Sequence, residues 1–220
     1  MTCARCGAEA PCTPTIFVVD DDEAMRHSLV FLLQSLGHPV ESFASAEAFL
    51  AGWQRRQAGC LVTDVRMPGL SGLELQRELG QRDDALGIVF ISGHGDIPMV
   101  VRAMRAGAIA FLEKPFNDQV LLDHVAEALA KSAEECARRA AAQDVAARVQ
   151  SLTMRERAVM ELVAAGKPNK VIAHELDISQ KTVEVHRAHV MEKMAAGSVA
   201  ELTRQLTLAG VIGAGLIGTD

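Results

Sequence analysis

The sequence has no hydrophobic run long enough to cross a membrane. A membrane-spanning helix needs about 20 consecutive apolar residues, whereas the apolar tail at residues 208–218 is short and rich in glycine. The amino terminus also lacks the apolar core of a secretory signal peptide. These absences argue against a membrane protein and predict a soluble, cytoplasmic one.

Net positive charge is also missing. The 220-residue chain carries a formal charge of -6, which excludes a polycationic nucleic-acid coat. Basic and acidic residues are equally numerous from Ser151 onward, so the charge deficit belongs wholly to the first part of the chain. A chain of this length has room for one or two domains.

The cysteines near the amino terminus lack the partners of a metal site. No histidine lies close to Cys3, Cys6 or Cys12, although a structural zinc ion takes about four ligands. A redox CxxC motif should open a helix after a strand, and that context is absent as well. Residues 1–14 are therefore predicted to be a disordered leader. Cys60 is expected in a core and Cys136 in a linker.

Polar side chains follow four short apolar runs. Such runs are typical of buried parallel strands, whose carboxyl ends converge on a crevice at one edge of the sheet. The residues concerned are Asp20, Asp21 and Asp22 after residues 16–19, Asp64 after 60–63, Ser92 after 88–91, and Lys114 shortly after 110–112. Clustered carboxylates repel one another unless a cation joins them, and these oxygen donors suit Mg2+ or Mn2+. Asp22 is instead expected to cap the following helix.

Helical patterns lie between these runs. Apolar residues recur at helical spacing in residues 23–36, 46–53, 73–79 and 99–106. Strands that alternate with helices predict a repeated β-α unit, and hence an α/β domain with a five-stranded parallel sheet covered on both faces.

Four motifs of this region resemble the receiver domain of bacterial response regulators, which has a CheY/flavodoxin-like fold. The motifs are VVDDDE, TDVRMPGLSGLEL, FISGHGDIPM and FLEKPF, and the resemblance covers residues 15–130. It implies that a sensor histidine kinase transfers a phosphoryl group to Asp64. The other implied roles are the metal ligands Asp20, Asp21, Asp64 and the carbonyl of Arg66; the catalytic and phosphate-binding residues Ser92 and Lys114; and the switch residues Ser92 and Phe111.

Two other classes of protein fit the sequence less well. A haloacid-dehalogenase-like phosphatase needs a second acid two residues after its nucleophile, and Arg66 stands at that position. A flavodoxin-like cofactor module needs a loop that cradles phosphate, whereas the first loop here is acidic and would repel it unless a metal is present. The protein is therefore not expected to be an enzyme, beyond its own phosphoryl transfer and slow dephosphorylation.

Residues 117–150 continue the helical pattern without glycine or proline. The alanine-rich composition favours one long helix or two placed end to end. Residues 131–150 are predicted to link two domains. The narrow apolar stripe of this stretch fits pairing with a second chain and an exposed spacer equally well.

Residues 151–212 are predicted to form a four-helix domain. Thr153 and Glu156 make a capping box, and helical patterns occupy residues 156–165, 168–176, 179–194 and 199–208. A short helix, a tight turn and a longer helix form a helix-turn-helix, whose second helix enters the major groove of DNA. Val183, Val190 and Met194 of that helix should face the core.

The second domain is similar to LuxR-type DNA-binding domains. Joined to a receiver, it resembles the FixJ/NarL class of response regulators, and the linker and GHGDIPM run are most similar to the FixJ branch. The class implies a phosphorylation-activated transcription regulator with promoter DNA and RNA polymerase as partners, followed here by a tail at residues 213–220. The expected DNA-binding residues are Lys170, Lys181, Thr182, Glu184, Val185, Arg187, Ala188 and Lys193, with Lys167 as a further phosphate contact.

Phosphorylation is expected to produce a homodimer. With few basic contacts, one DNA-binding domain should bind weakly, so two should occupy adjacent half-sites. In the helix at residues 99–106, Val100, Ala103 and Met104 are expected to face the sheet. Val101 and Arg105 should then form the dimer surface, opposite Asp118 or Asp123 of the second copy.

Overall fold

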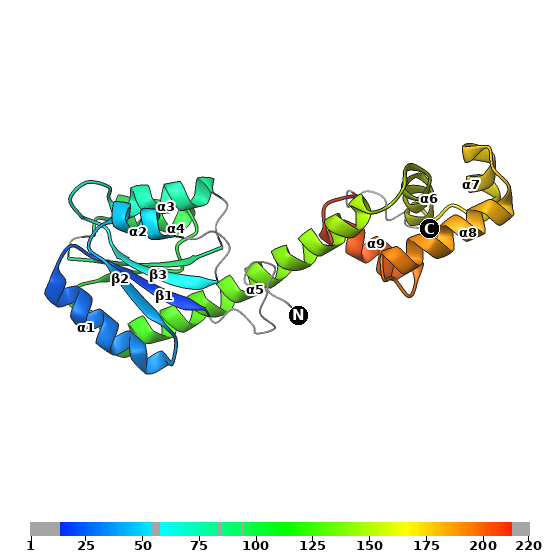
Figure 1. The fold of residues 1–220 in the computed structure, drawn as a ribbon. Coiled ribbons are helices and arrows are strands. Elements are labelled where there is room, and N and C mark those ends of the chain that lie inside the picture. Colours follow the sequence, from blue (N-terminus) through cyan, green and yellow to red (C-terminus); the bar gives the residue numbers. More distant parts are fainter. Residues whose placement is uncertain (1–13, 54–57, 83–84, 94, 213–220) are drawn as a thin grey trace. The chain divides into compact units, whose positions relative to one another are not determined.

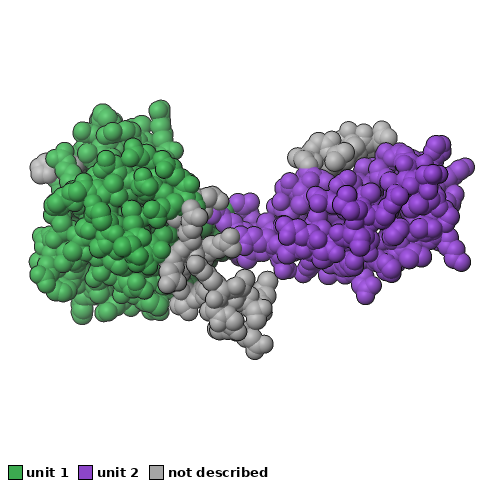
Figure 2. All heavy atoms as spheres, turned by 45° about the horizontal axis from the view of Figure 1, so that its top comes forward, with its two compact units in different colours: residues 1–136 green, residues 137–220 purple. Residues whose placement is uncertain are grey.

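The structure, a computed structural model, describes residues 14–53, 58–82, 85–93 and 95–212. The chain divides into two compact units, residues 1–136 and 137–220 (Figure 2). Residues 1–13, with Cys3, Cys6 and Cys12 of the predicted leader, lie outside the described residues, as does the predicted tail at residues 213–220. Within the described ranges no helix is both long and apolar enough to cross a membrane.

The first unit is built on a parallel sheet of five strands in the order β2-β1-β3-β4-β5 (Figure 1). The strands are β1 (Thr15–Val19), β2 (Val40–Phe43), β3 (Gly59–Asp64), β4 (Gly87–Ser92) and β5 (Ala110–Glu113). The apolar runs β1, β3 and β4 are buried over almost their whole length, as parallel strands covered on both faces should be. Strand β2 lies at the edge, and its sequence VESF has no apolar run that would have located it.

Helices cover both faces of the sheet, which confirms the predicted α/β receiver fold. Helices α2 (Ala46–Gly52), α3 (Gly72–Gln81) and α4 (Ile97–Arg105) lie on one face (Figure 1). Helices α1 (Glu23–Leu33) and α5 (Asp118–Gln150) lie on the other, and a 3-10 turn, Gln34–Leu36, extends α1. The two cores are separate sets of buried side chains, with Phe17, Phe49, Leu75 and Phe90 on one side of the sheet and Ile16, Leu29, Val62 and Leu121 on the other.

The prediction that Met104 faces the sheet is wrong. Met104 is 43% exposed, whereas Met99 and Ala103 are buried. Helix α4 begins at Ile97, two residues earlier than expected, so Met99 lies one turn before Ala103 on the inner face. Met104 follows Ala103 directly and therefore lies about 100° further round the helix. Val101 and Arg105 are exposed, as expected.

Helix α5 is one continuous helix of 33 residues. The sequence had left open one long helix or two placed end to end. Its first half packs on the sheet through Leu121, Val125 and Ala128. One turn later the buried Ser132 Oγ accepts a hydrogen bond of 2.9 Å from the backbone N–H of Gly59, where β3 begins. Its last turns carry Val145 and Val149, which belong to the core of the second unit.

The second unit contains α6 (Met154–Ala164), α7 (Asn169–Leu176), α8 (Gln180–Lys193) and α9 (Val199–Leu208). The predicted capping box of Thr153 and Glu156 starts α6. Between α7 and α8 the chain turns at Asp177, whose φ of 52° is left-handed, and Ser179 caps α8. Val183, Val190 and Met194 are fully buried, as predicted, which leaves the opposite face of α8 exposed.

Candidate functional site

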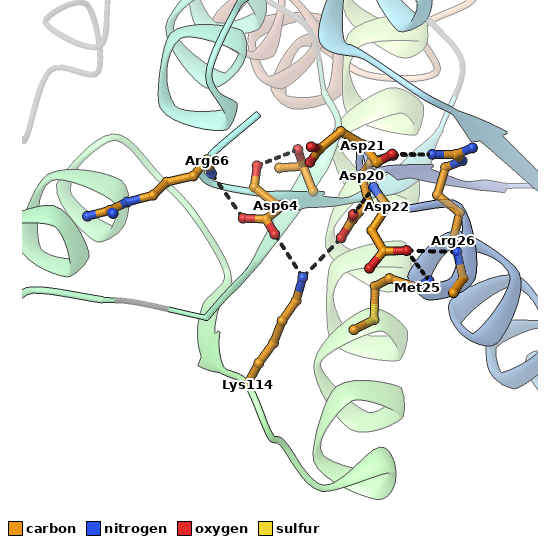
Figure 3. Close-up of polar contacts among 10 residues, drawn as sticks. Asp20, Asp21, Asp22, Met25, Arg26, Asp64, Arg66 and Lys114 are labelled. Atoms are coloured by element: carbon orange, nitrogen blue, oxygen red, sulfur yellow. Dashed lines mark hydrogen bonds and ion pairs between the residues drawn. The ribbon is translucent and has the colours of Figure 1, made fainter. Parts of the chain in front are cut away.

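Three strand ends of the first unit bring charged side chains together (Figure 3). Asp20 follows β1 and is only 1% exposed, Asp64 ends β3, and Lys114 follows β5. Lys114 Nζ lies 3.0 Å from Asp20 Oδ2 and 2.7 Å from Asp64 Oδ2. The parallel register aligns these strand ends, since Val19 pairs with Thr63 and Asp64 pairs with Ile91. The sheet therefore places side chains from distant parts of the sequence in one cluster.

The second oxygen of each carboxylate is held by the backbone. Asp20 Oδ1 accepts a hydrogen bond of 2.9 Å from the N–H of Asp22, and Asp64 Oδ1 accepts one of 2.9 Å from the N–H of Arg66 (Figure 3). Asp22 caps α1 by accepting hydrogen bonds from the N–H groups of residues 24 and 25, as predicted. The acidic loop is thus held in place by its own backbone before any ligand binds.

Arg26 is a residue of this site that the sequence did not single out. Its Nη1 donates hydrogen bonds of 2.8 and 3.0 Å to the backbone carbonyls of Asp20 and Asp21 (Figure 3). Arg26 lies one helical turn after Asp22, so its position in the first turn of α1 was the available signal. The guanidinium adds positive charge beside the acidic loop.

Burial and charge shift two pKa values in the cluster. Burial raises the pKa of Asp20, and the hydrogen bonds from Asp22 and Lys114 only partly offset it. For Lys114, burial acts to lower the pKa, but the hydrogen bonds and charges of Asp64 and Asp20 outweigh it, so the pKa is raised. Lys114 therefore remains a cation at neutral pH.

The donor set fits a divalent cation by type and charge. Asp20, Asp21 and Asp64 supply three carboxylates. The ammonium of Lys114 formally neutralises the charge of one of them, so negative charge remains for a cation to balance. Such oxygen donors are the ligands that Mg2+ prefers. Among the described residues, no three acidic, histidine or cysteine side chains converge as a metal cluster, and Lys114 contacts both Asp20 and Asp64.

The predicted switch residues lie on neighbouring strands. Ser92 ends β4 and is buried, and its carbonyl accepts a hydrogen bond of 2.8 Å from the N–H of Lys114. Phe111 of β5 is half-buried, and its ring centroid lies 6.1 Å from that of Phe90. A Cβ added to Gly95 would lie 2.9 Å from the Phe111 ring, so the backbone of Gly95 lies close to this aromatic.

In the second unit, most of the expected DNA-binding residues lie on the exposed side of α7 and α8. Lys170, Lys181, Glu184, Val185 and Ala188 are exposed, and Thr182 and Arg187 are half-buried. Arg187 Nη1 donates a hydrogen bond of 3.0 Å to Asn169 Oδ1 at the start of α7. This contact joins the two helices of the helix-turn-helix.

Lys193 and Lys167 are engaged within the second unit. Lys193 Nζ lies 2.7 Å from Glu156 Oε2, and Lys167 Nζ lies 2.7 Å from Glu175 Oε1. The paired residues lie 37 and 8 residues apart, beyond the three- or four-residue spacing at which side chains of one helix meet, so counting basic residues on a helix did not reveal them. Lys193, which was expected to contact a DNA phosphate, is thus paired with Glu156 of the same chain.

Two family models match the chain. Residues 16–126 match the response regulator receiver domain, and residues 150–206 match the bacterial regulatory proteins of the luxR family. The transcriptional regulatory protein FixJ of Azorhizobium caulinodans is 48% identical over 89% of this chain and 93% of its own. That of Rhizobium meliloti is 49% identical over 90% of this chain and 97% of its own.

The chain belongs to the FixJ-like response regulators. Among solved structures, that of the response regulator StyR is similar with a TM-score of 0.80 and 48% identity, covering 88% of this chain and 98% of that one. Full-length FixJ from B. japonicum gives a TM-score of 0.52 and 47% identity, covering 92% and 100%. The predicted pairing of a receiver with a LuxR-type domain is confirmed. This response regulator therefore combines a unit of the kind that histidine kinases address with a unit of the kind that binds DNA.

Proposed function

We propose that a sensor histidine kinase phosphorylates Asp64 of this response regulator and that phosphorylation activates the protein to regulate transcription through its DNA-binding unit. The cluster of Asp64, Asp20 and Lys114 is the observation that carries the proposal. An aspartate oxygen can attack phosphorus and form an acyl phosphate. Phosphoryl transfer depends mainly on positioning and on neutralisation of charge. Lys114, held 2.7 Å from Asp64, supplies a fixed positive charge where the phosphoryl oxygens would lie.

Mg2+ or Mn2+ would be held by Asp20, Asp21, Asp64 and the carbonyl of Arg66, and it supplies further charge neutralisation when bound. Lys114 would then pair with the phosphoryl group, because phosphorylation replaces the single charge of the Asp64 carboxylate with a dianion beside the ammonium. The hydroxyl of Ser92 is the expected hydrogen-bond partner of the same group. Its movement would open space for Phe111, which lies on the neighbouring strand β5.

The exposed face of α4 is the proposed dimer surface. Val101 and Arg105 lie on it, together with Ile97, which is 80% exposed, and Met104. Ile97, Val101 and Met104 follow one another at helical spacing and form an apolar stripe beside the basic Arg105. Asp118 and Asp123 of a second copy are candidate partners for that arginine. Dimerisation would raise the effective concentration of two DNA-binding units on adjacent half-sites of a promoter, where RNA polymerase is the expected partner.

Helix α8 is proposed to enter the major groove of promoter DNA. Lys170, Lys181 and Arg187 would contact phosphates, while Glu184 and Val185 would read base edges, with Thr182 and Ala188 beside them. We leave Lys193 out of the proposed contacts because it is paired with Glu156. Replacing Lys170 or Arg187 should weaken binding to all DNA, whereas replacing Glu184 or Val185 should change which sequence is preferred.

Phosphorylation at Asp64 is tested by intact-mass measurement after incubation with acetyl phosphate and Mg2+. The parent should gain one phosphoryl group, and Asp64→Asn should gain none, because an amide is not a competent nucleophile here. Asp22→Asn is the matched control, since asparagine also caps helices and this residue is outside the proposed acceptor set. Full labelling of Asp64→Asn would overturn the assignment.

The dimer surface is tested by sedimentation of the labelled proteins. Val101→Asp and Arg105→Glu should still take up the phosphoryl group but remain monomeric. Phe31→Asp is the control, because Phe31 is an exposed apolar residue on a different helix, α1. If the α4 variants dimerise like the parent, α4 is not the dimer surface.

A further inference from the structure

The loop that follows Asp64 is attached to helix α2. The backbone N–H of Leu70 donates a hydrogen bond of 2.8 Å to Glu47 Oε1, in the first turn of α2. The neighbouring Gly69 has a φ of 78°, and a Cβ added there would lie 2.5 Å from the same oxygen. The Glu47 carboxylate therefore lies directly against the backbone of the β3–α3 loop, residues 65–71.

Backbone hydrogen bonds hold the two ends of this loop in place. Near β3, the N–H of Arg66 donates to Asp64 Oδ1 at 2.9 Å, and the N–H of Gly72 donates to the carbonyl of Val65 at 3.0 Å. Met67 is buried in the core. Pro68 and Gly69 are exposed, and the contact with Glu47 holds the chain immediately after them.

We propose that Glu47 is a positioning residue of the phosphorylation site, which holds the β3–α3 loop so that the carbonyl of Arg66 is placed to bind the divalent cation. The inference rests on the proposed function, because it concerns the metal ligand set given there. A loop that is already ordered loses less conformational entropy when its carbonyl binds an ion. Loosening the loop should therefore weaken Mg2+ binding without removing any ligand.

Glu47 is itself well placed for this task. Ser45 caps α2 by accepting a hydrogen bond of 3.2 Å from the N–H of Ala48, which fixes the turn that carries Glu47. The pKa of Glu47 is lowered by hydrogen bonds from its own backbone N–H, from that of Leu70 and from Ser45, so the carboxylate stays ionised at neutral pH.

Two substitutions at Glu47 separate positioning from simple attraction between charges. Glu47→Gln keeps an amide oxygen that can accept from Leu70 but removes the negative charge. Glu47→Ala removes both. Positioning predicts that the dissociation constant for Mg2+ rises about 3- to 10-fold in Glu47→Ala, the value of one hydrogen bond, and stays within about twofold of the parent in Glu47→Gln.

The experiment is a calorimetric titration of the full chain with MgCl2 alone. Acetyl phosphate labelling at low and at saturating Mg2+ follows, and Glu47→Ala should be slow only at low Mg2+. Gly69→Ala is a second variant that keeps Glu47, and its strained backbone and clash with the carboxylate should also weaken Mg2+ binding. Glu127→Ala is the control, because Glu127 is an exposed acid of α5, which lies on the opposite face of the sheet from α2.

Parent-like Mg2+ affinity in Glu47→Ala would overturn the inference while leaving the proposed function intact. Equal losses in Glu47→Ala and Glu47→Gln would also overturn it, because they would show that charge alone matters. A parent that neither binds Mg2+ nor takes up a phosphoryl group would overturn the proposed function, and this inference with it.

Discussion

At the scale of single residues, Glu156 combines burial with a full set of hydrogen-bond partners. It is 4% exposed, and its Oε2 accepts hydrogen bonds from Lys193 Nζ at 2.7 Å and from the backbone N–H and the hydroxyl of Thr153 at 2.8 and 3.0 Å. The hydrogen bond from Lys193, followed by that from the Thr153 backbone, lowers the pKa of Glu156 to about 2. The same carboxylate thus caps α6 and holds the last turn of α8.

Glu156→Gln should lower the melting temperature of the second unit at pH 7, because Lys193 would lose its charged partner. A lowered folded-state pKa means that the ionised form stabilises the native state above pH 4.5, and that this contribution is lost as the pH falls toward 2. The parent should therefore lose stability more steeply than the variant over that interval. Thermal unfolding followed by circular dichroism measures both effects.

Glu161→Gln is the control for this experiment, since Glu161 is exposed and pairs with the exposed Arg157 of the same helix. Identical pH profiles for the parent and Glu156→Gln would contradict the assigned role of Glu156.

Residue roles were predictable from the sequence where they depend on a strand end. Asp20, Asp64 and Lys114 each follow an apolar run, and a parallel sheet must bring such positions together. Glu156 was recognisable as half of a capping box, but its partner Lys193 lies 37 residues further along the chain. Such pairs depend on how α6 and α8 pack, which hydrophobic spacing alone does not specify.

At the scale of elements, the backbone at the start of β4 is in close contact with the backbone of α5. A Cβ at Gly87 would lie 2.7 Å from Ala128 Cβ and 2.8 Å from the carbonyl oxygen of Ala128. Gly87→Ala should therefore destabilise the first unit by about 1–3 kcal/mol, the usual effect of overpacking. Urea denaturation of the full chain, followed by circular dichroism, measures this difference.

Gly80→Ala provides the comparison, because Gly80 lies in α3 and a Cβ there would meet nothing within 4 Å. Alanine loses less backbone entropy on folding than glycine, so this variant should be about 0.5–1 kcal/mol more stable than the parent. If both variants were more stable than the parent, or both less stable, close packing against Ala128 would not be the reason that position 87 requires glycine.

Helices and strands were predictable from the sequence where apolar residues mark a buried face. The buried strands and the amphipathic helices were found because apolar residues define them, whereas the edge strand β2 has exposed residues at its centre and gave no such signal. The inner face of α4 was assigned one residue out of register at Met104, because the sequence there offers apolar residues on both faces: Met99 and Val100 inside, Ile97 and Val101 outside.

At the scale of the whole molecule, one helix contributes to both cores. Leu121, Val125 and Ser132 of α5 are buried in the first unit, and Val145 and Val149 are buried in the second. The sequence showed an uninterrupted helical pattern but could not show where packing on one unit ends and packing on the other begins. Alanines dominate the stretch, and they fit an exposed helix as readily as a packed one.

Because α5 contributes side chains to both cores, a stable fragment of the second unit should include the last turns of α5. A fragment of residues 151–212, the predicted DNA-binding domain, should be less stable than one of residues 143–212 by about 3 kcal/mol or more. The longer fragment retains Val145 and Val149, and burying each such side chain is worth about 1.5–3 kcal/mol. It also retains Arg148, whose Nη1 donates a hydrogen bond of 3.1 Å to the carbonyl of Met194 at the end of α8.

Urea denaturation of the two fragments, followed by circular dichroism, measures the difference. A third fragment, residues 137–212, is the control, because residues 137–142 contribute no buried side chain to the described structure and should add little stability. Equal stability of fragments 143–212 and 151–212 would show that the last turns of α5 only cover the domain. A large difference would show instead that these turns are part of the core of the DNA-binding unit.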